Sequence, residues 1–317
     1  MADGEFHPPP AELNRRCLFL AGPTAVGKSS LALPLAEKIG GEIISVDSMQ
    51  VYRGLDLGTA KPSPEDRVRV RHHLIDVADL GESFDAARFC RMAAQAVEEI
   101  ISRGRVPIFC GGTGLYFKAY LQGLGAAPPR SDSLRATLEK IPLPQLLTEL
   151  SERDPAAWSR IDRNNLRRVV RAVEVIRLTG RPYSAQRAAW TTDAGEPAAN
   201  FFGLRRSSMD LARRIDQRVE KMFAAGLVEE TRRLLDQGLE KNPTAMQALG
   251  YRQVVDFLRG RCPLPQTMEL VKIRTRQFAR RQMTWFRNQA TLNWIDLTSA
   301  AGSEAYWFET ISNALAR

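Results

Sequence analysis

The chain has 317 residues, a length that predicts two domains or one domain with a sizeable insertion. Its composition, 44% hydrophobic and 26% charged, is that of a globular protein and excludes a collagen-like, disordered or disulfide-stapled chain. No stretch reaches the roughly 18 consecutive apolar residues of a membrane span, so we expect no membrane partner and a cytoplasmic location. The four cysteines share no close metal-type spacing and are expected to be buried thiols.

Positive charge is concentrated in the second half of the chain. Residues 1–158 carry 18 Lys and Arg against 20 Asp and Glu, whereas residues 159–317 carry 27 against 16. Most of the excess is arginine, which suits bidentate contacts with phosphate and stacking on bases. A face that binds a polyanion is one interpretation and a solvated basic surface is the other, and charge alone does not decide between them.

The first half of the chain predicts a parallel α/β sheet. Residues 1–15, rich in proline and acidic residues, are expected to be a disordered tail. Short apolar runs typical of buried strands occupy 16–22, 42–46, 73–77 and 106–110. Helical apolar spacing occupies 29–39, which Gly40 and Gly41 end, and 85–103, which follows a start signal at Ser83 and Asp85. Buried strands that alternate with helices indicate parallel pairing.

The pattern changes between residues 123 and 198. Linker-like stretches at 123–133 and 191–197 enclose a region with only helical patterns, among them 164–178. Beyond this region we predict strands at 201–204 and 292–295 and long helices at about 209–237 and 265–288. The prediction is therefore an α/β catalytic core, made of 16–122 and 199–317, with an all-helical insertion domain at 123–198.

One motif predicts phosphate binding. Residues 22–29 fit the pattern G-x-x-x-x-G-K-[ST] and lie between a predicted strand and a predicted helix, as a P-loop should. In such a loop, backbone N–H groups form an anion nest at a helix N-terminus, the lysine neutralises phosphate oxygens, and the Ser hydroxyl can ligate Mg²⁺. The loop consists of Gly22, Pro23, Thr24, Ala25, Val26, Gly27, Lys28 and Ser29. The motif does not identify the phosphate compound.

Two further loops are expected beside the P-loop. Asp47 follows the second predicted strand, and Thr113 follows the fourth. In an open parallel sheet, ligands bind at the carboxyl ends of the strands, so these loops converge on a candidate site. Asp47 can accept a proton or hold a metal there, but an Asp after a strand can also simply cap the following turn. Both interpretations of Asp47 stay open.

Several motifs occur together in the order seen in bacterial tRNA dimethylallyltransferases, a family that the chain resembles from about residue 17 to 295. These motifs lie at 22–29, 47–52, 54–62, 72–76, 111–116, 250–252 and 281–287. Two departures, Val26 for a small Ser or Gly and Leu57 for Ile, remove no functional group. The resemblance implies a fold like that of P-loop kinases. It also implies transfer of the dimethylallyl group from dimethylallyl diphosphate to N6 of the adenosine immediately 3′ of the anticodon, at tRNA position 37, with Mg²⁺ as cofactor.

On the donor side, the resemblance implies that the P-loop holds the diphosphate, with Mg²⁺ on Ser29. Breaking the allylic C–O bond develops negative charge on the diphosphate, which Lys28 and an arginine would stabilise where it grows. The family's arginine corresponds to Arg218, and Thr24 can hydrogen-bond the diphosphate. The alternative for Arg218 is an ion pair on the helix surface with Asp216 or Glu220.

On the acceptor side, the resemblance implies that Asp47 takes a proton from the adenine amine, a poor nucleophile, as the N–C bond forms. Thr113 would orient the base, which must leave the stack of the anticodon loop. The partner would be the anticodon stem-loop of tRNA, bound by a protein expected to be a monomer. The tRNA contacts so implied are Asp47, Ser48, Met49, Gln50, Thr113, Arg167, Arg168, Arg171, Gly250, Tyr251, Arg252, Arg280, Arg281, Gln282, Trp285 and Arg287. The alternative for Trp285 is a place in the core.

Other classes of protein compete with this interpretation. A P-loop alone favours a small-molecule kinase or ATPase, which would need a lid of arginines and a phosphoacceptor site. An adenylate isopentenyltransferase of cytokinin synthesis shares the P-loop and the Asp after the second strand, but the 58–62 stretch and the basic insertion favour the tRNA enzyme. For a non-catalytic RNA-binding protein the basic half would suffice, and the convergence of Asp47 and Thr113 on the P-loop argues against it.

Overall fold

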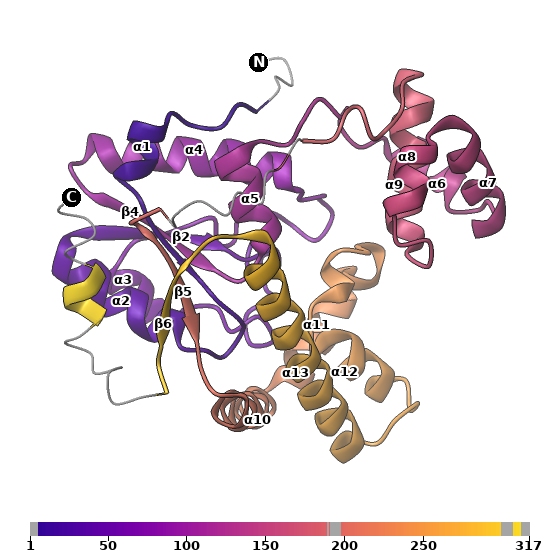
Figure 1. The fold of residues 1–317 in the computed structure, drawn as a ribbon. Coiled ribbons are helices and arrows are strands. Elements are labelled where there is room, and N and C mark those ends of the chain that lie inside the picture. Colours follow the sequence, from indigo (N-terminus) through magenta and orange to yellow (C-terminus); the bar gives the residue numbers. More distant parts are fainter. Residues whose placement is uncertain (1–5, 189, 191–197, 299–306, 312–317) are drawn as a thin grey trace. The chain divides into compact units, whose positions relative to one another are not determined.

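A computed structural model describes residues 6–188, 190, 198–298 and 307–311 (Figure 1). The chain divides into two compact units. The core unit comprises Pro8–Leu121 and Thr192–Arg317, and the insertion unit comprises Met1–His7 and Gln122–Thr191. Within the described ranges, no helix is long and apolar enough to cross a membrane.

The core unit is built on a sheet of six parallel strands in the order β3-β2-β4-β1-β5-β6. The strands are β1 (Leu18–Ala21), β2 (Gly41–Val46), β3 (His72–His73), β4 (Val106–Gly111), β5 (Phe201–Arg205) and β6 (Asn293–Asp296). The central strands are buried because helices cover both faces, which explains their nearly continuous apolar runs. The predicted α/β class with a parallel sheet is confirmed.

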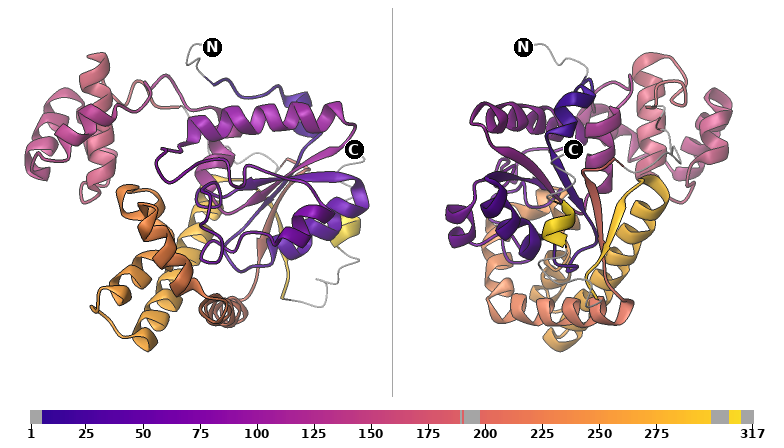
Figure 2. Two further views of the ribbon diagram at one scale, coloured as in Figure 1. Left: turned by 180° about the vertical axis from the view of Figure 1, so that it is seen from behind. Right: turned by 60° about the vertical axis from the view of Figure 1, so that its left-hand side comes forward.

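Helices on the two faces of the sheet fix where the loops emerge (Figures 1 and 2). On one face, α2 (Lys28–Ile39) packs against β1, β2 and β4, and on the other lies α4 (Ala86–Ser102), whose first turn is capped by Asp85. The short helices α1 (Ala11–Arg15), α3 (Pro64–Arg69) and α5 (Gly114–Gln122) complete this half of the core. The P-loop follows β1, which pairs with β4, so it lies beside the loop that follows β4, and β4 pairs in turn with β2.

The second half of the core unit adds a group of helices. They are α10 (Ser208–Ala224), α11 (Leu227–Asp236), α12 (Tyr251–Leu258) and α13 (Leu264–Gln289), with 3-10 turns at Leu239–Lys241 and Ala245–Gln247. Helix α10 packs against α13, and α12 packs against both α11 and α13. The single helix predicted at 209–237 is wrong, since Gly226 adopts a φ of 101° and separates α10 from α11.

Two further predictions about local structure need correction. The predicted disordered tail contains α1, whereas residues 1–5 lie outside the described ranges. The strand predicted at 73–77 is only two residues long, because Leu74 and Asp76 adopt φ values of 60° and 57° and turn the chain out of the sheet. The predicted linker at 191–197 also falls outside the described residues.

The described part of the insertion unit contains four helices and no strand. They are α6 (Asp132–Leu138), α7 (Leu143–Arg153), α8 (Pro155–Arg160) and α9 (Leu166–Thr179). Leu138, Leu146, Leu150, Val169 and Val173 are fully buried in its separate apolar core. This core fits the prediction that the region between the two linker-like stretches is helical.

A buried carboxylate joins two of these helices, α6 and α9. Glu174 of α9 is fully buried and accepts hydrogen bonds from Ser131 N (2.8 Å), Arg135 Nη2 (3.0 Å) and Arg171 Nη1 (2.7 Å). Burial alone would raise the pKa of Glu174, but the hydrogen bonds from the two arginines hold it below its ordinary value. The ion pair therefore stabilises the insertion unit when Glu174 is ionised.

We expect Glu174→Gln to destabilise the insertion unit by about 2–3 kcal/mol, because it leaves two guanidinium groups without their buried counter-charge. Faster hydrogen exchange in α9 would report this loss. The wild-type contribution should disappear as the pH falls through the lowered pKa of Glu174, and the variant should lack this acid-dependent loss. Glu149→Gln is the matched control, because Glu149 also binds two arginines but is more exposed (21% against 0%). Equal exchange in both variants would contradict the assigned role of Glu174.

Candidate functional site

The P-loop connects β1 to α2 and takes the backbone form that its glycines allow. Gly22 has a φ of 156°, and a Cβ at this position would lie 2.8 Å from Leu204 O. Gly27, with a φ of 112°, caps the N-terminus of α2. The ammonium of Lys28 donates to Gly22 O (2.9 Å) and Pro23 O (2.8 Å), and its burial lowers the pKa of Lys28 to about 8. The loop thus places a cation at a helix N-terminus, an arrangement that favours phosphate.

Three arginines that follow β5 in the chain contact the P-loop. Arg206 Nε donates to Val26 O (2.7 Å), and Arg214 Nε on α10 donates to Ala25 O (2.9 Å). Arg218 Nη1, one turn further along α10, donates to Thr24 Oγ1 (3.3 Å). Burial, and then the charge of Arg214, lower the pKa of Arg218. Removal from water and mutual repulsion of the arginines both make the site favourable for an anion.

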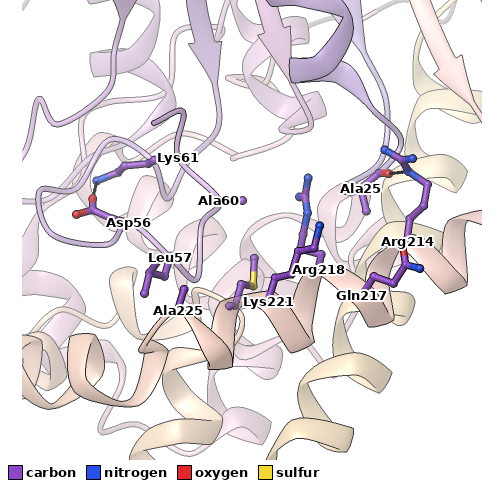
Figure 3. A pocket seen from close by; sticks show the side chains of 11 residues that line it. Ala25, Asp56, Leu57, Ala60, Lys61, Arg214, Gln217, Arg218, Lys221 and Ala225 are labelled. Atoms are coloured by element: carbon purple, nitrogen blue, oxygen red, sulfur yellow. Dashed lines mark hydrogen bonds and ion pairs between the residues drawn. The ribbon is translucent and has the colours of Figure 1, made fainter. Parts of the chain in front are cut away.

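The alternative interpretation of Arg218 as a surface ion pair is wrong. Asp216 pairs instead with Arg276 (2.6 Å), and Glu220 pairs with Lys272 (2.7 Å). The guanidinium of Arg218 donates to Thr24 of the P-loop, and Figure 3 shows its side chain extending from α10 into the pocket. The charge of Arg218 therefore remains available at the candidate site.

A pocket of about 430 Å³ opens between the P-loop, the segment 54–62 and α10 (Figure 3). Cationic groups line part of it, namely Arg214, Arg218, Lys61 and Lys221, although Lys61 is bound by Asp56 at 2.8 Å. The apolar groups that line it are Ala25, Leu57, Ala60, Met222 and Ala225. This combination suits a small ligand with an anionic head and an apolar tail.

Asp47 and Thr113 lie on adjoining loops, as predicted. Asp47 Oδ1 accepts hydrogen bonds from Met49 N (2.8 Å) and Gln50 N (3.3 Å), so this oxygen caps the turn. Within the described part of the chain, Asp47 Oδ2 has no hydrogen-bond donor, so capping leaves one carboxylate oxygen for other chemistry. Thr113 Oγ1 accepts from Ser48 N (3.2 Å), which joins the loop after β4 to the loop after β2.

Three predicted tRNA contacts make hydrogen bonds within the core unit, and their contact with tRNA stays a prediction. Gln50 accepts from Ser45 Oγ (2.8 Å) and donates to Thr59 O (3.1 Å), which fixes the 54–62 segment. Tyr251 is fully buried, and its hydroxyl donates to Glu230 Oε1 (2.6 Å) and accepts from Gly58 N (3.1 Å). Gln282 is 9% exposed and its amide bonds only to other loops of the core. Hydrogen bonds within the protein thus occupy all three side chains.

Arg171 also has partners within the protein. Its guanidinium donates to Glu174 Oε2 (2.7 Å) and to Pro128 O (2.6 Å), which holds it against the insertion unit's own chain. Arg167 and Arg168, by contrast, are exposed on α9. Of the three arginines predicted here to bind tRNA, two therefore present their side chains to solvent.

Apart from Ser48 and Met49, which lie in the loop after β2, the remaining predicted tRNA contacts are distributed over α12 and α13. Arg252, Arg280, Arg281 and Arg287 are exposed, and Gly250 begins α12 with a φ of 96°. Trp285 is half-buried, with its ring so close to Gly114 that a Cβ there would lie 2.1 Å from it. The ring therefore packs against the start of α5, and the contact of Trp285 with tRNA stays a prediction.

The described residues offer no cluster of three or more His, Cys, Asp or Glu side chains that could hold a metal. Ser29, the predicted Mg²⁺ ligand, is exposed in the first turn of α2. A single protein hydroxyl is compatible with Mg²⁺ binding. This ion usually keeps several waters and binds through substrate phosphates rather than through a full set of protein ligands.

Sequence reasoning missed several residues of the site. Arg214 lies four residues before Arg218, a spacing that places both on one face of a helix and was a usable signal. No comparable signal marks Arg206, because its contact with Val26 O depends on the pairing of β5 with β1. Lys221 and Met222 enter the pocket only because α10 lies across from the 54–62 segment.

Comparisons with known proteins agree with this geometry. The family model described as IPP transferase matches residues 50–289. The tRNA dimethylallyltransferase of Geobacter metallireducens is 46% identical over 290 residues, covering 90% of this chain and 94% of that protein. The corresponding protein of Geobacillus kaustophilus is 42% identical, covering 94% of this chain and 95% of its own length.

Solved structures give the same result. The tRNA isopentenylpyrophosphate transferase of Bacillus halodurans matches with a TM-score of 0.68 and 38% identity, covering 94% of this chain and 96% of that one. A eukaryotic dimethylallyltransferase acting on tRNA matches with a TM-score of 0.75 and 27% identity, covering 94% of this chain and 78% of that one. The chain therefore belongs to the IPP transferase family, and the two bacterial relatives are named as prenyl-transferring enzymes.

Proposed function

We propose that this chain transfers the dimethylallyl group from dimethylallyl diphosphate to N6 of the adenosine immediately 3′ of the anticodon, tRNA position 37, and releases diphosphate. The observation that carries the proposal is the arrangement of the loops at one edge of the sheet. The side chains of Lys28, in the P-loop, and Arg218, on α10, both donate hydrogen bonds to P-loop oxygens. The loop beside it carries Asp47, and one carboxylate oxygen of Asp47 has no hydrogen-bond donor among the described residues. The relatives' names, which describe transfer of a dimethylallyl group to tRNA, agree with it.

The donor half of the site supports departure of a diphosphate. As the allylic C–O bond breaks, its electron pair passes to the bridging oxygen, and negative charge grows on the leaving group. Lys28 and Arg218 contact the two ends of the segment 22–24, so both cations are already in place when that charge develops. The apolar side chains of the pocket, among them Leu57 and Met222, suit the five-carbon dimethylallyl group.

We propose Mg²⁺ as the cofactor. Ser29 would hold it with diphosphate oxygens and water, and the ion, when bound, would neutralise part of the leaving group's charge. The cationic side chains around the P-loop would neutralise the rest of that charge.

The acceptor half of the site supports attack by an adenine amine. The lone pair of this amine is delocalised into the ring, so removal of a proton as the N–C bond forms helps directly. Asp47 Oδ2 would accept that proton while Oδ1 keeps the carboxylate in place through Met49 N. Thr113, held to the Asp47 loop through Ser48 N, would orient the flipped base.

We also propose that the exposed arginines of α9, α12 and α13 bind the anticodon stem-loop, and that the protein acts as a monomer in the cytoplasm, where its tRNA substrate would be found. The exposed candidates are Arg167, Arg168, Arg252, Arg280, Arg281 and Arg287. Accessible guanidinium groups suit phosphate contacts and stacking on unpaired bases.

Neutralising Arg167 and Arg168 together, as glutamines, is expected to weaken stem-loop binding and to lower the slope of log affinity against log salt by about 1–2. Each lost phosphate contact removes about 0.7–0.9 from this slope. The measurement is binding of a labelled anticodon stem-loop over a series of salt concentrations. Arg153→Gln with Arg177→Gln is the matched control, because both arginines already bind Glu149 in the same unit. A slope equal to the wild-type slope would mean that Arg167 and Arg168 only solvate α9.

The proposed function is tested by following the prenyl group. The protein is incubated with Mg²⁺ and labelled dimethylallyl diphosphate, together with tRNA, AMP or ATP in separate reactions. We expect label only in tRNA. Label in AMP or ATP would instead indicate a cytokinin-type isopentenyltransferase, and label in none of them, with RNA binding intact, would indicate a non-catalytic RNA-binding protein.

A further inference from the structure

The side chain of Gln282 joins the P-loop to the loop after β4. We call the P-loop the donor loop, because it would hold the prenyl donor, and the loop after β4 the acceptor loop, because its Thr113 would orient the adenine. Gln282 lies on α13, is 9% exposed, and reaches between the P-loop and the loop after β4. Its Oε1 accepts from Thr24 N at 2.8 Å, and its Nε2 donates to Gly112 O at 2.9 Å. One amide group thus satisfies a backbone donor of one loop and a backbone acceptor of the other.

The surroundings of Gln282 leave little freedom for this bridge. A Cβ at Gly112 would lie 2.3 Å from Gln282 Nε2 and 3.2 Å from Gly22 O. The absence of a side chain at position 112 therefore lets the amide enter between the loops. Only a side chain with both a donor and an acceptor at its tip can make the two bonds, so a planar amide of this length suits the position.

Each of the two loops joined by Gln282 also contacts residues to which the proposed function gives a role in catalysis. On the donor side, Thr24 carries the hydroxyl that accepts from Arg218 Nη1 at 3.3 Å. On the acceptor side, Gly112 precedes Thr113, whose Oγ1 accepts from Ser48 N at 3.2 Å beside Asp47. A continuous path of covalent and hydrogen bonds therefore runs from the leaving-group side to the proton-acceptor side, with Gln282 in its middle.

We propose that Gln282 is a positioning residue that sets the distance between the donor loop and the acceptor loop, and thereby the approach of the adenine amine to the allylic carbon. This inference rests on the proposed function. Gln282 itself touches no reacting atom; it acts through Thr24 and Thr113. Because a displacement of about 1 Å between reacting groups can cost about 10²-fold in rate, loss of the bridge should affect the chemical step far more than binding.

The first test compares Gln282→Met with Gln277→Met. Met has nearly the length of Gln but cannot bridge the loops, and Gln277 lies on the same helix, where its one hydrogen bond to a described side chain comes from Arg274 Nη1 at 3.2 Å. We expect Gln282→Met to lower the single-turnover rate of prenyl transfer by about 10–100-fold. Its affinities for the anticodon stem-loop and for inorganic diphosphate with Mg²⁺ should stay within about 3-fold of wild type, and Gln277→Met should behave as wild type. A Gln282→Met rate within about 2-fold of wild type would overturn the proposal.

A second variant disturbs the bridge from the other side. Gly112→Ala would push the Gln282 amide away, and it should lower the rate without any change at position 282. If both substitutions act through one bridge, the double variant should be little slower than the slower single variant, because a methionine on α13 has no bridging bonds left to lose. Losses that multiply would show two independent effects and would overturn the proposal.

The bridge can also be tested independently of catalysis. Hydrogen exchange in peptides that cover residues 22–28 should be faster in Gln282→Met than in wild type, because Thr24 N loses its acceptor. Unchanged exchange would refute the bridge itself. Faster exchange in a protein whose wild type prenylates no tRNA would support the bridge and refute the proposed function, so the two failures are distinguishable.

Discussion

Replacing Asp47 by asparagine is expected to lower the single-turnover rate of prenyl transfer about 10²–10⁴-fold, the usual contribution of a positioned general base. Asparagine is chosen because its side-chain oxygen can still accept from Met49 N and Gln50 N, so the turn after β2 keeps its cap. The substitution thereby removes the proton acceptor without removing the local structural contact. The measurement is transfer of labelled dimethylallyl to an anticodon stem-loop with enzyme in excess.

Binding distinguishes a chemical role of Asp47 from a structural one. Stem-loop affinity and diphosphate affinity should both stay within about 3-fold of wild type. Asp85→Asn is the matched control, because Asp85 also caps a turn through Oδ1, at Arg88 N (2.8 Å), but caps the start of α4 rather than the loop after β2. If Asp47→Asn transferred the prenyl group at nearly the wild-type rate, Asp47 would be only a capping residue.

Replacing Arg218 by methionine is the second change for which we expect a large effect, a loss of about 10²–10³-fold in the rate of transfer. Methionine keeps much of the side-chain length but removes the charge that faces Thr24, where the leaving group would develop its own. Arg213→Met is the control on the same helix, because Arg213 is exposed and pairs with Asp210 at 2.9 Å.

The two substrates should respond differently to the Arg218 substitution. Kinetics with dimethylallyl diphosphate should be impaired, whereas stem-loop affinity should hardly change, because Arg218 faces the P-loop. A large loss of stem-loop affinity with normal donor kinetics would instead assign Arg218 to RNA binding. The predictions for Asp47 and Arg218 thus separate the proton-acceptor side of the site from the leaving-group side.

The P-loop, helix α4 and the placement of Asp47 could be predicted because local sequence patterns determine them. The P-loop follows from glycines at positions that need positive φ, and α4 from an Asp85 cap and a regular apolar spacing. The position of Asp47 beside Thr113 follows from the rule that parallel strands bring their carboxyl ends to one edge. In each case, a few neighbouring residues carry the information.

Contacts between distant segments were not predictable in the same way. Gln282 is separated from Thr24 by 258 positions, and the family resemblance implied only a tRNA contact for it. The resemblance implied a tRNA contact for Tyr251 as well, although its side chain is fully buried and its hydroxyl accepts from Gly58 N. Which polar side chains bond to other loops depends on how α12 and α13 pack, and periodicity along one helix does not encode this packing.

Two matched anticodon stem-loops test the central claim most directly, one with adenosine at position 37 and one with guanosine there. Each is incubated with the protein, Mg²⁺ and dimethylallyl diphosphate. The stem-loop is then digested to nucleosides, whose masses are measured by mass spectrometry after separation. The account predicts an adenosine that has gained one dimethylallyl group in the first stem-loop and no prenylated nucleoside in the second. Equal prenylation of both stem-loops, or of neither, would contradict it.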